Sequence, residues 1–260
     1  MTDHHARVAD FAALHRPGQP LILFNAWDAG SARSIVEAGA PAIATGSWSV
    51  AAAHGVADAE GLPIELALAN AERIVAAVDV PVTIDFEGAY AIDSDQVGAN
   101  MLRLAATGAV GCNFEDQVVG GEGLHATAIQ SDRIAAARNA VGSDFFINAR
   151  IDLFLRAKRE QHERSLGEAL ERGHAYAAAG ANGLFFPGLA DPDLIGRACE
   201  ESPLPVNIMA MPGAPSANVL AGLGVARISH GPFPYRAMIE WLKSAAAEHY
   251  RPLDLGGNAA

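Results

Sequence analysis

The feature that most constrains the fold is a regular alternation of short apolar runs with longer segments of helical periodicity. Eight runs have the length and apolar content of buried strands, at residues 21–25, 42–45, 82–86, 110–114, 145–149, 183–186, 206–209 and 226–229. Between them lie segments with helical spacing of apolar residues, at 29–38, 64–78, 94–107, 131–141, 166–179, 191–200 and 216–222. Repeated strand–helix units require parallel strands joined by right-handed crossovers, so the pattern predicts an α/β protein.

Glycine follows several of the predicted helices, at Gly39, Gly108, Gly180 and Gly224. A glycine in this place supplies the left-handed cap that returns the chain to the next strand. Eight such units in 260 residues favour a closed (β/α)8 TIM barrel over an open sheet. We therefore predict one barrel domain over residues 1–260, with an N-terminal helix at 8–15 and a C-terminal helix at 235–249.

Composition limits the partners and the compartment. The formal net charge of −12 repels nucleic acids and anionic lipid, so we expect neither a nucleic acid nor a membrane as a partner. Cys112 and Cys199 are the only cysteines, which excludes a disulfide framework and favours a reducing cytoplasm. No run approaches the length of a membrane span, and residues 1–16 lack the apolar segment of a secretory signal. We expect a soluble, cytoplasmic protein.

Two acidic residues, Asp85 and Glu87, lie at the end of the third predicted strand, in the run Val82-Thr83-Ile84-Asp85-Phe86-Glu87-Gly88. In an extended chain, side chains two residues apart share a face, so Asp85 and Glu87 should point the same way. Like charges that close together raise a pKa or require a cation. The pair therefore indicates a site for a hard divalent cation such as Mg²⁺, and the alternative is two merely solvated acids at a strand end.

Other polar residues follow the remaining strands, and a barrel places its active residues at these carboxyl ends. They include Asn25, Thr45, Ser47, Asn113, Glu115, Asp116, Asn148, Arg150, Asp152, Asn207, Ser229 and His230. Acids from the third and fourth strands would thus face Arg150 from the fifth. Since arginine binds carboxylates and phosphonates in a bidentate manner, this set favours a small anionic substrate chelated through Mg²⁺. Alternatively, Arg150 and Asp152 form a structural ion pair.

The motifs, taken in order, resemble those of the isocitrate lyase and phosphoenolpyruvate mutase superfamily. They are Asn25-x-Trp27-Asp28, Thr45-Gly46-Ser47, Asp85-x-Glu87-Gly88-x-Tyr90, Glu115-Asp116 and Asn148-x-Arg150-x-Asp152. The resemblance covers nearly the whole chain. It implies a (β/α)8 barrel in a homo-oligomer, a dimer or a tetramer, whose eighth helix packs on a neighbouring subunit. It also implies breaking or rearranging C–C or P–C bonds beside an enolate, in 2-oxo acids or related hydroxy acids.

The resemblance implies a metal site at the third and fourth strands. Asp85, Glu87 and Glu115 would hold Mg²⁺, some of them through water, and Mn²⁺ is an alternative ion. Asp58, in the loop after the second strand, matches a further acid near the metal in the family.

The substrate side of the site is also implied by the resemblance. Thr45, Gly46 and Ser47 match the segment that binds the substrate carboxylate or oxyanion. Arg150 matches the arginine that clamps the substrate, and Asn207 is a weaker candidate for the pocket wall.

The loop after the fourth strand departs from the family pattern. Isocitrate and methylisocitrate lyases have a Lys-Lys-Cys-Gly-type sequence there, with cysteine as acid/base, whereas residues 117–125 contain neither lysine nor cysteine. We therefore do not expect isocitrate cleavage, and the lysine and asparagine typical of the mutase and hydrolase branch are absent too. His125 lies in this loop and is our candidate acid/base, although a histidine hydrogen-bonded for structural reasons is the simpler interpretation.

These observations favour a Mg²⁺-dependent lyase that acts on a small 2-oxo acid or a related hydroxy acid through an enolate. Decarboxylation of oxaloacetate is the leading example, and another C–C cleavage is open. One alternative is P–C bond chemistry on phosphonopyruvate, and another is a protein that binds metal and 2-oxo acid with little turnover. A Schiff-base aldolase is excluded, because Lys158 and Lys243, the only lysines, lie off the predicted strands.

Overall fold

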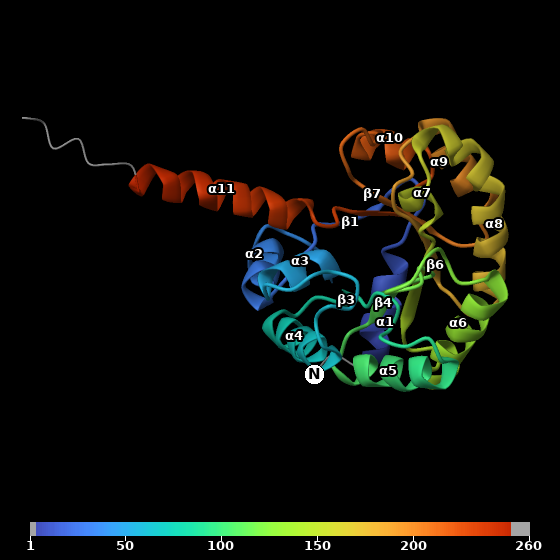
Figure 1. Cartoon of the computed structure of the whole chain (residues 1–260), viewed down its shortest axis with the longest axis horizontal. Helices are drawn as coiled ribbons and strands as arrows, with labels where there is room; N and C mark the ends of the chain where they lie inside the picture. The colour runs from blue at the N-terminus through green and yellow to red at the C-terminus, as the bar shows by residue number, and fades with distance from the viewer. Residues whose placement is uncertain (1–3, 251–260) are drawn as a thin grey trace, which may run out of the picture.

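The computed structural model describes residues 4–250 and shows a ring of eight parallel strands surrounded by helices (Figure 1). The strands are β1 (Leu21–Leu23), β2 (Ile43–Ala44), β3 (Val82–Asp85), β4 (Gly111–Glu115), β5 (Phe146–Arg150), β6 (Gly183–Phe186), β7 (Val206–Met209) and β8 (Arg227–Ser229). They pair in the order β1-β8-β7-β6-β5-β4-β3-β2. A bridge between Ala26 and Thr45, with the Ala26 amide donating to Ala44 at 2.8 Å, joins the two ends of this order. The predicted TIM barrel is confirmed.

The helices cover the outside of the strands. They are α2 (Ala29–Glu37), α4 (Ile64–Ala77), α5 (Ser94–Ala106), α6 (Thr127–Val141), α8 (His162–Ala178), α9 (Pro192–Glu201) and α10 (Ala217–Gly222). Two short helices were not predicted, α3 (Ser47–Ala53) and α7 (Leu153–Arg156), together with a 3-10 turn at Arg159–Gln161. They lie in the loops after β2 and β5, where one or two turns give no periodicity to detect. None of the helices within residues 4–250 is long and apolar enough to cross a membrane.

Helix α1 (His4–Ala13) begins and ends earlier than the predicted 8–15, and it closes the amino-terminal end of the barrel. Its Phe11 is fully buried and packs edge-on against Phe146 of β5, with 5.4 Å between ring centroids. His15 stacks on the same Phe146 ring at 4.4 Å. Aromatic rings thus fill the amino-terminal end of the barrel within the part of the chain that the structure describes.

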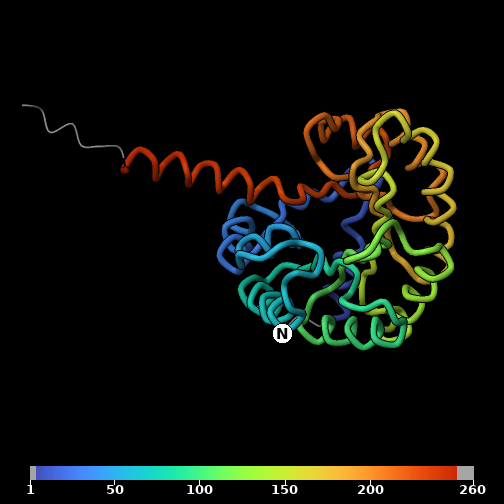
Figure 2. The backbone as a smooth tube through the Cα atoms, in the orientation of Figure 1, coloured from blue at the N-terminus to red at the C-terminus, as the bar shows by residue number. Residues whose placement is uncertain are grey.

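The last helix, α11 (Phe233–His249), projects away from the barrel (Figures 1 and 2). Pro234 is its only buried residue among those described, and Trp241 is 67% exposed. Helix α11 therefore leaves the outer face of β1 uncovered, and Ile22 and Phe24 there are each 47% exposed. An apolar stripe along α11, made of Met238, Ile239, Trp241, Leu242 and Ala245, is not buried against its own barrel.

Candidate active site

A cavity of about 270 Å³ opens at the carboxyl ends of the strands. One part of its wall is polar and comes mainly from β1 to β5 and the loops that follow them. This part consists of Asn25, Gly46, Ser47, Asp58, Asp85, Asn113 and Arg150. The remainder is mostly apolar and consists of Trp48, Leu155, Phe185, Pro187, Met209, Ser229, Gly231, Pro232, Phe233 and Arg236. The cavity lies where the sequence predicted the active residues of a barrel.

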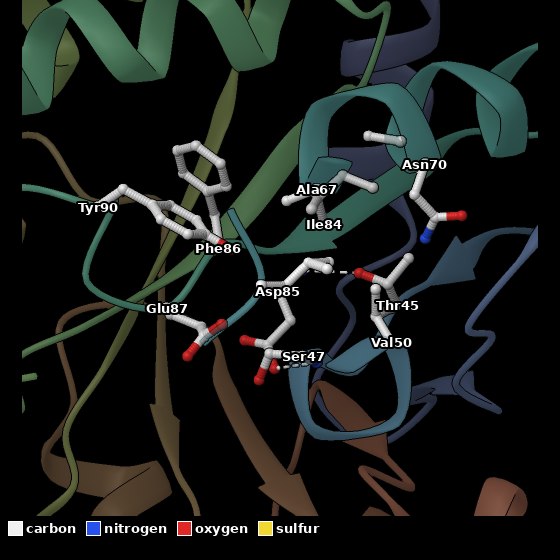
Figure 3. A pocket seen from close by; sticks show the side chains of 12 residues that line it. Thr45, Ser47, Val50, Ala67, Asn70, Ile84, Asp85, Phe86, Glu87 and Tyr90 are labelled. Atoms are coloured by element: carbon white, nitrogen blue, oxygen red, sulfur yellow. Dashed lines mark hydrogen bonds between the residues drawn. The ribbon is translucent and has the colours of Figure 1, made fainter. Parts of the chain in front are cut away.

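Asp85 is held in place by hydrogen bonds to its neighbours, and Figure 3 shows those to Thr45 and Ser47. Its Oδ2 accepts a hydrogen bond from the Ser47 amide at 3.0 Å, and its Oδ1 accepts one from Asn113 Nδ2 at 3.3 Å. Its own amide donates to Thr45 Oγ1 at 2.9 Å. Each carboxylate oxygen keeps a lone pair for a ligand, and the orientation of the group is fixed in advance.

The segment Thr45-Gly46-Ser47, which was predicted to bind the substrate anion, hydrogen-bonds to other groups of the protein in this structure. The Ser47 amide donates to Asp85, as described above, and the Gly46 amide donates to Ala26 at 3.3 Å in the closure of the barrel. Gly46 and Ser47 line the cavity, whereas Thr45 lies behind Asp85 in a smaller adjoining pocket. The main contribution of this segment here is to orient Asp85.

Glu87 adopts a left-handed backbone, with φ of 49°, and the residue is 5% exposed. Its Oε2 accepts from the amide of Glu60 at 2.7 Å, and Glu60 Oε1 in turn accepts from the amide of Tyr90 at 2.8 Å. Burial and, to a smaller extent, the charges of Asp58 and Asp85 raise the pKa of Glu87 to about 8. These bonds attach the loop that contains Asp58 and Glu60 to the segment that follows β3. The part that Glu60 plays was not predicted from the sequence.

Arg150 forms the cationic side of the cavity. Its Nε and Nη2 donate to the two oxygens of Asp152 at 2.7 and 2.9 Å, and its Nη1 lies 2.8 Å from Glu115 Oε2. The same Nη1 is 3.9 Å from Asp85 Oδ1. Burial would lower the pKa of Arg150, but Asp152, Glu115 and Asp85 together raise it well above its usual value, so the guanidinium stays charged. The ion pair foreseen as an alternative thus exists, and Arg150 still faces the cavity.

Asp116, next to Glu115, belongs to the framework rather than to the cavity. It is fully buried and accepts hydrogen bonds from the Asp152 amide at 3.0 Å and the Tyr176 hydroxyl at 3.0 Å. Arg172 lies 3.3 Å from the same carboxylate. Asp116 thereby fixes the backbone of the residue that orients Arg150.

The acids fit a hydrated divalent cation better than a closed metal cage. Among residues 4–250, no three acids, histidines or cysteines are close enough to bind one ion together. Glu87 is turned toward Glu60, and Glu115 toward Arg150. However, burial and the charge of Asp85 raise the pKa of Asp58, a repulsion that a cation would relieve. Mg²⁺ often binds through one or two carboxylates and keeps several waters, which suits direct binding to Asp85 with the other acids reached through water.

The structure does not bring His125 or Asn207 to the cavity wall. His125 is 7% exposed, its amide donates to Asp116 at 2.8 Å, and burial lowers the pKa of its imidazole. Asn207 is buried, and its Oδ1 accepts from Ser229 Oγ at 3.2 Å, so that Ser229 lines the cavity in its place.

Three comparisons with known proteins place these features in a wider context. The profile of the phosphoenolpyruvate phosphomutase family matches residues 11–250. A crystal structure from Burkholderia cenocepacia J2315, provisionally assigned as a phosphonomutase, superposes with a TM-score of 0.92 at 48% identity, covering 95% of this chain and 100% of that one. An uncharacterized protein of Mycobacterium tuberculosis is 33% identical over 231 residues, 87% of this chain and 83% of its own length. The 2-methylisocitrate lyase of Salmonella typhimurium is 28% identical, over 75% of this chain and 70% of its own.

Proposed function

The chain belongs to the phosphoenolpyruvate phosphomutase family, and we propose that it is a Mg²⁺-dependent lyase of small 2-oxo acids or related hydroxy acids. Its superfamily contains lyases, among them the 2-methylisocitrate lyase of Salmonella typhimurium. The observation that carries the proposal is the shared cavity wall of Asp85 and Arg150, an oriented carboxylate beside an oriented guanidinium. Such a pair can bind a metal ion and the carboxylate of a chelating substrate at the same time.

Arg150 binds the substrate carboxylate in this proposal. A guanidinium has five N–H groups, and hydrogen bonds to Asp152 use two of them. The three others, on Nη1 and Nη2, remain for Glu115 and for a ligand. Because Asp152 and Glu115 already fix the side chain, little conformational entropy is lost when an anion binds.

Asp85 holds the metal ion, with Asp58, Glu87 and Glu115 reached through water. Mg²⁺ supplies Lewis-acid stabilisation of the negative charge that develops on the 2-oxo oxygen of the substrate. The Ser47 amide and Asn113 Nδ2 keep the Asp85 carboxylate in its orientation while that charge forms.

Asp58 is the candidate proton donor. It lies in the loop after α3 and lines the cavity, and both burial and the charge of Asp85 raise its pKa above the usual value. After the bond at C3 breaks, the Asp58 carboxyl would transfer its proton to that carbon. We favour Asp58 over the predicted His125, since His125 does not reach the cavity wall.

A turnover assay with oxaloacetate tests the proposal. We expect formation of pyruvate that requires Mg²⁺ and is lost in EDTA or in the Arg150→Lys variant. Thermal stabilisation by Mg²⁺ and pyruvate with no product from oxaloacetate or alkyl-substituted malates would instead support a binding protein with little turnover. If neither stabilisation nor product is found, the proposal is wrong.

P–C bond chemistry on phosphonopyruvate is the second candidate function. It is favoured by the Burkholderia cenocepacia protein, provisionally a phosphonomutase, at 48% identity. Residues 117–125 weaken it, because they contain neither the lysine nor the asparagine typical of the mutase and hydrolase branch. Phosphorus NMR of phosphonopyruvate incubated with the protein and Mg²⁺ separates the candidates: free phosphate or phosphoenolpyruvate would support this function.

Finally, we propose a homo-oligomer in which α11 packs on a neighbouring copy. The exposed apolar face of β1, with Ile22 and Phe24, adjoins a hollow of about 370 Å³ lined by Met211, Leu220 and Phe233. The apolar stripe of α11 offers matching chemistry, and its own barrel does not cover it.

A further inference from the structure

The cavity has a second arginine in its wall, Arg236, in the first turn of α11. We propose that Arg236 determines substrate specificity by pairing with a second anionic group, a carboxylate or a phosphonate, at the far end of the substrate. This inference rests on the proposed function, since it takes the first carboxylate to be bound by Arg150. Arginine suits both groups, because its planar fork matches their oxygens in a bidentate geometry.

The side chain of Arg236 packs against aromatic rings, although most of α11 projects into solvent. The guanidinium carbon lies 4.3 Å from the centroid of the Trp48 ring and 5.8 Å from that of Phe233. Tyr235, the preceding residue, makes edge contacts with Trp48 and with Trp27, at 6.1 and 5.1 Å between centroids. A guanidinium that contacts an aromatic ring through its carbon still has N–H groups at its edge for an anion.

Arg236 has no competing partner in the part of the chain that the structure describes. No ion pair or side-chain hydrogen bond involves it, whereas Arg150 is bound by both Asp152 and Glu115. Arg150 and Arg236 are also the only cationic side chains among the residues lining the cavity. The loop at 117–125, where relatives supply a lysine, contributes no lysine or arginine. Arg236 is therefore the group available for a second negative charge.

The wall near Arg236 is largely apolar, with Leu155, Phe185, Met209 and Phe233. Such a wall would accept a small alkyl substituent on the substrate, whereas Arg236 itself is solvent-exposed. A carboxylate paired with arginine resists loss as carbon dioxide, because decarboxylation removes its charge. We therefore expect Arg236 to contribute to the binding of oxaloacetate without accelerating its decarboxylation.

The contribution of the second anionic group can be measured with two pairs of ligands. The members of each pair share the groups that Mg²⁺ and Arg150 would bind, and only one member has the second anionic group. Malate has one carboxylate more than lactate, and phosphonopyruvate has a phosphonate that pyruvate lacks. Titration calorimetry with Mg²⁺ gives the affinity ratio within each pair for the full-length protein and its variants. We expect Arg236→Gln to lower at least one ratio about tenfold while leaving lactate and pyruvate binding unchanged. Arg236→Lys should lower it less, since the charge remains but the planar fork is lost.

Lys243→Gln is the matched control, because it removes a positive charge from the exposed part of the same helix. A fall in the malate ratio alone identifies a carboxylate as the second group, and a fall in the phosphonopyruvate ratio alone identifies a phosphonate. Unchanged ratios in Arg236→Gln would overturn the assignment and reduce Arg236 to an anchor of α11. If the unaltered protein bound neither lactate nor pyruvate in the presence of Mg²⁺, the proposed function itself would fail, and this inference with it.

Discussion

The two parts of the cavity wall differ in how firmly their charged groups are held. In the part built from β3 to β5, Arg150 is fixed by Asp152 and Glu115, and Asp85 by Ser47 and Asn113. In the part built from β7, β8 and α11, the guanidinium of Arg236 packs against the rings of Trp48 and Phe233 and forms no ion pair within residues 4–250. Preorganised polar groups serve the chemical step, whereas an adaptable apolar wall serves recognition. The difference therefore separates the reaction from the choice of substrate.

Removing the Arg150 guanidinium should have the largest effect, because Arg150 is the cation around which the part of the wall built from β3 to β5 is organised. We expect Arg150→Ala to lower kcat/KM about 10³-fold, because the substrate carboxylate loses its partner. Stability should fall by about 3–5 kcal/mol as well, since Asp152 and Glu115 are left buried without their cation. Steady-state kinetics and urea denaturation measure the two effects. An active and stable Arg150→Ala protein would show that the guanidinium is not the clamp.

A smaller change, Asp85→Asn, keeps the shape of the side chain and removes its charge. We expect turnover to fall about a hundredfold and Mg²⁺ affinity to fall with it, because the direct metal ligand is lost. Stability without metal should hold or rise, since repulsion with Asp58 and Glu87 is relieved. Asp58→Asn is the matched control: it should impair turnover while retaining most of the Mg²⁺ affinity. Equal loss of Mg²⁺ binding in both variants would contradict the assignment of Asp85 as the direct ligand.

The raised pKa of Glu87 predicts a pH dependence of stability in the metal-free protein. Glu87 has a pKa of about 8 when folded and about 4.5 when unfolded, so the folded state holds its proton over the interval between them. The free energy of unfolding should therefore fall as pH rises from 4.5, by up to ~5 kcal/mol once pH exceeds 8. Urea denaturation in EDTA across this range measures the effect, and Glu87→Gln should flatten the curve. If stability fell equally with pH in the unaltered protein and in Glu87→Gln, the pH dependence would not come from Glu87.

The smallest expected effect on a single chain concerns the outer face of β1. Replacing both Ile22 and Phe24 by serine should change the stability of one chain by less than about 1 kcal/mol, because both are already half exposed. The same change should dissociate the proposed oligomer, as measured by light scattering. Leu102→Ser on α5, at a site 55% exposed, is the control and should leave association intact. If the double variant had the same mass in solution as the unaltered protein, the outer face of β1 would not be part of the interface.

The sequence predicted the part of the cavity wall built from β3 to β5 far better than the part built from β7, β8 and α11. Asp85, Glu115 and Arg150 lie at fixed places relative to buried strands, so the barrel alone brings them together. Glu60 could not be found in this way, because its bonds to Glu87 and Tyr90 depend on left-handed residues that leave no periodic pattern. In the loop at 117–125, the family resemblance suggested His125, but its position depends on how the loop packs against Asp116.

The C-terminal helix shows a different limit of sequence analysis. An apolar stripe looks the same whether it packs on its own barrel or on another, so the direction of α11 could not be predicted. The place of Arg236 in the cavity wall follows from that direction and from its contact with Trp48, which comes from a short helix that the sequence did not reveal. The residues to which we assign substrate specificity therefore lie in segments whose sequence patterns do not determine their position.

The most direct test of the central claim is the binding of oxalate, a stable mimic of the enolate of pyruvate, measured by titration calorimetry with and without Mg²⁺. The proposed site predicts tight binding that requires the ion and is lost in both Arg150→Ala and Asp85→Asn, but not in Lys243→Gln. Oxalate binding of equal strength without Mg²⁺, or binding that survives both substitutions, would contradict a metal ion and an arginine acting together in this cavity.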